Sequence, residues 1–188
     1  PMAAAGVLAH RVGGLAVRHT RRMSLPSAAA IAPHELLLAR TYLRLTGKAL
    51  SPGLDEKVLF GLDDRTAAAR SHEQLWNADF ALLSHGTQPS PIINYGNLMA
   101  MNLFEVDWKA LTSMESKYTA QQDVREDRQE LLQRVREYGY VDDYTGIRIS
   151  ATGKLFRISQ ATVWELHCPK SGVRLGQAAT FRRPTQPV

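Results

Sequence analysis

The stretch FALLSHGTQPSPIINYGNLMAMNLF, residues 80–104, changes its hydrophobic period halfway along. Its apolar residues first alternate as in a half-buried strand, and after Asn97 they recur at helical spacing. A glycine and two prolines between the apolar runs mark a turn. The stretch therefore predicts an antiparallel hairpin with strands at 80–84 and 92–95, followed at once by a helix that Asn97 caps. This order is typical of a sensor or docking module and not of a catalytic scaffold.

The rest of the chain divides into a helical first part and a strand-rich end. Amphipathic patterns predict helices at residues 34–46, 65–78, 108–114 and 123–138. After Gly139 the alternation of apolar and polar residues predicts a three-strand meander, with strands at 147–150, 155–168 and 173–181. We therefore expect an α+β fold: a PAS-like five-stranded antiparallel sheet with helices on one face, plus N-terminal helices. The hairpin is expected to neighbour the meander and to lie centrally in the sheet.

The first 33 residues differ in composition from the remainder. They carry four arginines and no acidic residue, whereas the remainder holds 19 Lys+Arg and 18 Asp+Glu. A basic, acid-poor segment is typical of an organelle transit peptide, although a plain disordered tail has the same composition. We place the folded domain at residues 34–183 and a short tail at 184–188. The nearly neutral domain gives no case for nucleic acid as a partner, and without an apolar run of 18 residues no membrane partner is expected.

One set of motifs runs in order through nearly all of residues 34–183. They are SHGT at 84–87, PIINYGN at 91–97, LFEVDW at 103–108, DDYTGIRIS at 142–150, ATVW at 161–164 and GQAATF at 176–181. The aromatic Tyr95 and the helix-capping Asn97 resemble the PAS signature, and the full set resembles the MEKHLA domain, a PAS-like family. The resemblance implies sensing, signalling or regulation without a defined reaction. Because similar stand-alone proteins are bacterial and algal, it also favours the chloroplast as location, with the mitochondrion as the alternative.

Polar residues among apolar ones on the long strand suggest a ligand cavity. The alternation predicts one shared face for Phe156, Ile158, Gln160, Thr162, Trp164 and Leu166. In a PAS-like fold such a face lines a cavity under the helices, and Tyr95 and Asn97 approach the same space. An apolar cavity with a few polar groups suits a small ligand. The candidate site is therefore Tyr95, Asn97, Gln160, Thr162 and Trp164, and the alternative is a filled core.

No residue pattern predicts catalysis, a metal site or a cofactor. Cys168 lies outside the helix motif of flavin-binding PAS relatives, and none of the six histidines is placed to bind haem or a metal. Asp142 and Asp143 diverge in an extended segment, so we expect them to be solvated or linked to Arg148 or Arg157.

We therefore expect a soluble, non-enzymatic sensory or regulatory domain that binds a small molecule or a protein partner of unknown identity. One alternative is an interaction module without a ligand, in which the helix at residues 34–46 forms a homodimer. A small-molecule enzyme is the weaker alternative.

Overall fold

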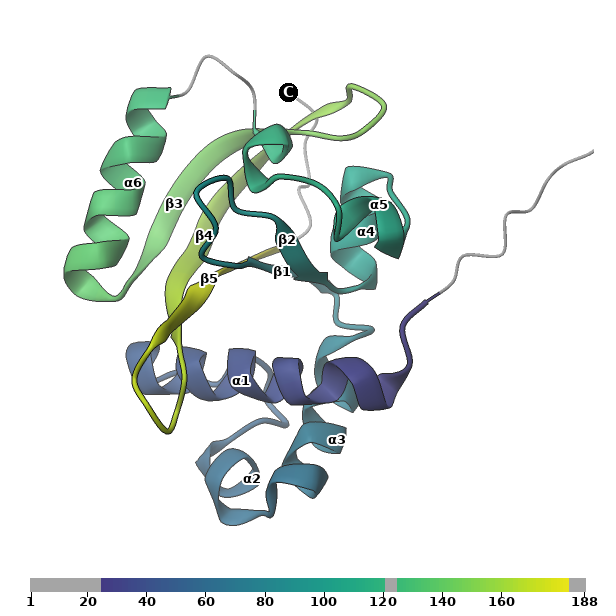
Figure 1. The fold of residues 1–188 in the computed structure, drawn as a ribbon, viewed down its shortest axis with the longest axis vertical. Helices are drawn as coiled ribbons and strands as arrows, with labels where there is room; N and C mark the ends of the chain where they lie inside the picture. Colours follow the sequence, from purple (N-terminus) through teal and green to yellow (C-terminus); the bar gives the residue numbers. More distant parts are fainter. Residues whose placement is uncertain (1–24, 121–124, 183–188) are drawn as a thin grey trace, which may run out of the picture.

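The computed structural model describes residues 25–120 and 125–182. These form a five-stranded antiparallel sheet of order β2-β1-β5-β4-β3 (Figure 1). The strands are β1 (Phe80–His85), β2 (Ile93–Gly96), β3 (Tyr140–Ile149), β4 (Leu155–His167) and β5 (Arg174–Arg182). The predicted sheet is confirmed, and the hairpin joins the meander by pairing of β1 with β5. The predicted central position of the hairpin was wrong, because β2 is an edge strand.

Helices cover both faces of the sheet. Before the sheet come α1 (Ala28–Thr46), α2 (Glu56–Gly61) and α3 (Asp64–Leu75); between β2 and β3 come α4 (Leu98–Phe104), α5 (Trp108–Leu111), the 3-10 helix η1 (Ser116–Thr119) and α6 (Arg125–Tyr138). Trp164 of β4 belongs to one buried cluster with Leu38 of α1, whereas Ala161 of the same strand belongs to another with Phe104 of α4. The N-terminal helix α1 therefore covers one face, and α4 and α6 cover the other.

A β-bulge at Gln160 reverses the alternation of β4. Gln160 has a φ of 50° and an exposed side chain, and the register between β3 and β4 shifts here. Before the bulge Ile158 faces α4, and after it Ala161 does, while Trp164 faces α1. The expectation that Gln160 and Trp164 share a face with Phe156 and Ile158 was wrong, because one extra residue moves every later side chain to the opposite face.

Asn97 fixes the junction between the hairpin and α4, as predicted. Its Oδ1 accepts hydrogen bonds from the backbone N–H of Ala100 in the first turn of α4 and of Leu82 in β1, both at 3.0 Å. Its Nδ2 donates to the carbonyl oxygens of Leu75 and Phe80, at 3.0 and 2.8 Å. One fully buried amide thus caps α4 and ties it to α3 and β1.

The helix α1 begins earlier than the sequence pattern predicted. It starts at Ala28 and contains Pro33, and both Ile31 and Ala32 are buried in the core. The helix therefore extends six residues before its expected start at residue 34. The predicted transit peptide falls mainly on residues 1–24, which lie outside the described residues, and it stays a prediction.

The paired aspartates of β3 form surface ion pairs with residues other than the predicted ones. Asp142 lies 3.3 Å from Lys48, and Asp143 lies 2.8 Å from Arg134 of α6. The expected partners were Arg148 and Arg157. The side chain of Arg148 instead stacks over the Tyr144 ring at 5.2 Å.

Candidate functional site

A narrow cavity lies between the sheet and the helices α4 and α6. Its volume is about 100 Å³, and its lining includes Ile158, Ala161, Gln177 and Leu131. Pockets that take small ligands usually measure about 300–1,000 Å³. The cavity is therefore too small for such a ligand in the conformation described here.

None of the predicted site residues lines this cavity: Tyr95, Asn97, Gln160, Thr162 and Trp164. Tyr95 and Trp164 share the core beneath α1, where the indole N–H of Trp164 donates to Thr41 Oγ1 at 3.1 Å. Thr162 is also buried, whereas Gln160 is exposed on the bulge. The structure therefore brings Tyr95 and Trp164 into one packed core and leaves Gln160 outside it.

The polar centre of the core beneath α1 is Glu35, which is fully buried. Its Oε1 accepts a hydrogen bond from the Tyr95 hydroxyl at 2.6 Å, and its Oε2 lies 2.8 Å from Nδ1 of His72 in α3. Burial first, and then the neighbouring carboxyl group, raises the pKa of Tyr95 far above its usual range. The phenol therefore stays protonated and donates. Because an unpartnered carboxyl group would be costly to bury, these three side chains hold one another in place.

Glu35 was not singled out in the sequence, although a signal was present. It lies four residues after Ile31 and four before Ala39, and both of these are buried. An acidic residue inside the apolar stripe of an amphipathic helix is a candidate buried charge. Its partners could not be named, since His72 and Tyr95 come from other elements.

A second polar chain links α1 to the hairpin. Nε2 of His34 lies 2.8 Å from Ser84 Oγ, and the Ser84 hydroxyl donates to Asn94 Oδ1 at 2.7 Å. Burial lowers the pKa of His34 to about 4, so its ring is neutral at pH 7. Because the Ser84 hydroxyl proton is engaged by Asn94, Nε2 of His34 is the donor in this chain. The His34 ring also packs beside Tyr95, with centroids 5.6 Å apart.

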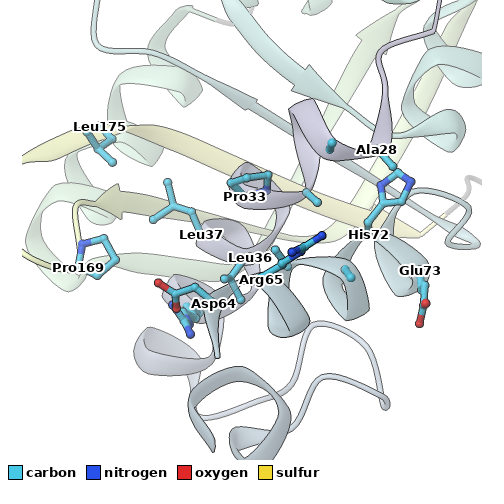
Figure 2. A pocket seen from close by; sticks show the side chains of 15 residues that line it. Ala28, Pro33, Leu36, Leu37, Asp64, Arg65, His72, Glu73, Pro169 and Leu175 are labelled. Atoms are coloured by element: carbon cyan, nitrogen blue, oxygen red, sulfur yellow. The ribbon is translucent and has the colours of Figure 1, made fainter. Parts of the chain in front are cut away.

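A larger, open groove runs between α1 and α3 and reaches the turn between β4 and β5. Its volume is about 830 Å³. Small and apolar side chains line most of it, including Ala32, Pro33, Leu36, Leu37, Ala68 and Ala69. Figure 2 shows the imidazole of His72 beside Ala28 at one end, and Pro169 with Leu175 at the other. Through His72 the groove is in direct contact with the buried Glu35.

The described residues offer neither a metal site nor a helix that could span a bilayer. Within residues 25–120 and 125–182 no group of three His, Cys, Asp or Glu side chains is placed to hold a metal ion. No helix in these two ranges is both long and apolar enough to cross a membrane. Cys168 lies in the turn after β4, where hydrogen bonds from Ser171 lower the pKa of its thiol.

Comparisons with known proteins agree with the fold. The family model of the MEKHLA domain matches residues 32–185. Two relatives from Arabidopsis thaliana are the homeobox-leucine zipper proteins ATHB-14, 28% identical over 143 residues, and ATHB-9, 27% identical over 147. These matches cover 75% and 77% of this chain but 16% of each relative, so the chain spans about a sixth of their length.

A solved structure with a similar fold is the PAS domain of a protein from Colwellia psychrerythraea. It has a TM-score of 0.52 and 10% identity, and the match covers 61% of this chain and 94% of that domain. This likeness concerns the fold alone.

Proposed function

Because the chain belongs to the MEKHLA domain family, we propose that it is a non-enzymatic PAS-like regulatory domain that senses a small molecule in the groove between α1 and α3. The groove has the volume and the apolar lining of a small-molecule site, whereas the inner cavity of about 100 Å³ does not. The side chains that line the groove include neither a hydroxyl nor a thiol group that could act as a nucleophile. Binding, without chemistry on the ligand, is the role that this lining supports.

The observation that carries the proposal is the hydrogen-bonded chain from His72 through Glu35 to Tyr95. His72 lines the groove, Glu35 is fully buried in α1, and Tyr95 belongs to the edge strand β2. A ligand that contacts His72 therefore acts on a group only two hydrogen bonds away from the sheet. Since a buried carboxyl group needs its partners, a change at His72 alters the energy of the contact between α1 and β2.

A second candidate function is docking of a protein, including another copy of this chain. Next to the groove, the hairpin between β4 and β5 exposes Val173 and Leu175, at 60% and 40% of their surfaces. Leu175 also lines the groove, so the apolar surface continues from the groove onto this hairpin. Contiguous apolar surface of this kind is typical of interaction sites.

The test is native mass spectrometry of the full chain, purified from its own cells and compared with variants. Ala69 is exposed and lines the groove, so Ala69→Phe fills the groove without disturbing the core. Arg70→Phe is the control, because it places the same ring on the next residue of α3, which does not line the groove. We expect a bound small mass in the wild-type and Arg70→Phe proteins and its loss in Ala69→Phe. An unliganded dimer that Ala69→Phe converts to monomer would favour the docking function instead.

A further inference from the structure

We infer that the groove binds a single-chain apolar carboxylic acid, with the carboxylate between Arg65 and His72 and the chain directed toward Leu175. This inference rests on the function proposed above, and it adds the chemical class of the ligand. Two independent features of the groove support it: the charges along α3 and the apolar wall of α1.

The charges that line the groove leave an uncompensated cation on α3. Arg40 and Asp64 pair with each other at 2.7 Å, and Glu73 pairs with Arg70 at 3.0 Å. Arg65 also lines the groove, and it makes no ion pair with any residue that the structure describes. Among these ionic side chains, Arg65 is therefore the one that a bound anion would neutralise.

His72 provides a second polar contact on the same face of the helix. Arg65 and His72 are seven residues apart, which is two turns of α3, so both face the groove. In the view of Figure 2, Arg65 lies between Asp64 and His72. Glu35 holds Nδ1 of His72, so the ring is fixed. In its imidazolium form the ring donates Nδ1–H to Glu35 and presents Nε2–H to a carboxylate ligand. A carboxylate suits this pair, since a guanidinium group donates two parallel hydrogen bonds to it.

The remainder of the groove suits a hydrocarbon chain. Beyond Arg65 its wall consists mainly of Pro33, Leu36 and Leu37 of α1, and it ends at Leu175. Burial of each methylene group in an apolar site raises affinity by up to about fourfold. Affinity is therefore expected to rise with chain length until the chain reaches Leu175.

Tryptophan fluorescence gives a direct readout of this binding mode. The Trp76 ring stacks on the His72 ring, with ring centroids 5.9 Å apart and an interplanar angle of 27°. The ring centroids of Trp108 and Trp76 are also 5.9 Å apart. A carboxylate at His72 changes the environment of Trp76 without the need for a label.

The experiment is a fluorescence titration of the full chain at pH 7.5, below the aggregation concentration of each probe. The probes are decanoate, decanol and decyltrimethylammonium, which share a chain and differ in charge. We expect decanoate to bind about tenfold or more tightly than decanol, and the cation to bind more weakly still. Arg65→Met should weaken the binding of decanoate about tenfold and leave the affinity for decanol unchanged. Arg70→Met, on the same helix but outside the groove, should change neither affinity.

The outcomes that would contradict the inference distinguish a wrong ligand class from a wrong binding site. If decanol binds as well as decanoate and Arg65→Met has no effect, the carboxylate assignment is wrong while the groove site stands. If no probe binds and Ala69→Phe leaves the native mass unchanged, the proposed site is wrong as well. Binding to phosphatidylglycerol vesicles without binding of monomeric decanoate would overturn the inference in favour of a membrane lipid.

Discussion

The hydroxyl of Tyr95 in β2 donates a 2.6 Å hydrogen bond to the buried carboxyl group of Glu35 in α1, which joins the N-terminal helix to the sheet. Removal of the hydroxyl in Tyr95→Phe leaves one carboxyl oxygen without its partner, and we expect a loss of about 2 kcal/mol in the free energy of unfolding. Urea denaturation measures this loss. Tyr138 is 66% exposed, so Tyr138→Phe should change the free energy by less than about 0.5 kcal/mol.

A double-mutant cycle tests whether the two residues act as a pair. We expect the loss in the free energy of unfolding caused by Tyr95→Phe to be at least about 1 kcal/mol smaller in a Glu35→Leu background than in the wild type. Additive effects would show that the hydrogen bond does not link the helix to the sheet energetically.

Asn97 should be among the most sensitive polar positions in the chain. Asn97→Ala removes a helix cap and leaves buried backbone groups of Leu75, Phe80 and Leu82 without partners. The expected loss is about 3 kcal/mol, measured by urea denaturation. Asp107→Ala is the comparison, because Asp107 caps α5 through a single bond to Ala110 at the surface and should cost about 1 kcal/mol. Equal losses at the two positions would contradict the role given to Asn97.

Gly176 of β5 lies against the backbone of β1 and does not tolerate a side chain. Its φ is 149°, and a Cβ atom there would lie 1.9 Å from the carbonyl oxygen of His85. Gly176→Ala should therefore force β1 and β5 apart and cost about 3 kcal/mol. Gly153 also has a positive φ, of 86°, but a Cβ atom there meets nothing within 4 Å, so Gly153→Ala should cost only about 1 kcal/mol. Thermal unfolding of the two variants separates the steric clash from backbone strain.

The half-buried His34 makes folding stability depend on pH. Its pKa is about 4 in the folded protein and about 6.5 in the unfolded chain, so the unfolded chain binds more protons between these values. The stability that neutral His34 contributes is therefore complete above about pH 6.5 and is lost as the pH falls toward 4. Between these two pKa values the free energy of unfolding should fall by at most about 1.4 kcal/mol for each pH unit by which the pH is lowered.

The measurement is urea denaturation between pH 7 and pH 5, before most carboxyl groups titrate. His34→Gln should flatten the slope, because it keeps a polar side chain and removes the proton. The exposed His167 serves as the control, and His167→Gln should keep the wild-type slope. A wild-type slope in His34→Gln would show that other groups cause the pH dependence.

Local sequence signals predicted the hairpin and the cap at Asn97, because strand alternation, turn residues and caps act within a few residues. They did not predict the bulge at Gln160. A non-glycine residue at positive φ has no strong local signal there, and the pairing of β4 with β3 determines where the extra residue falls. The error at this one position moved Trp164 from the predicted cavity face to the face beneath α1.

The groove could not be predicted, because it arises from how α1 packs beside α3. Each helix shows its own apolar stripe, but the alanines at positions 68 and 69 carry no signal of an open space until α1 is placed beside them. The start of α1 was also not predicted, because the residue before a proline usually marks a helix boundary, whereas α1 continues through Pro33.

Chemical-shift mapping of the ¹⁵N-labelled full chain with decanoate locates the bound ligand. We expect the backbone amide shifts to change mainly on α1 and α3 around Arg65 and His72, and the changes to extend through Glu35 to Tyr95. Changes that instead concentrate around Leu131, Ile158 and Gln177 would place the ligand in the inner cavity and rule out binding in the groove.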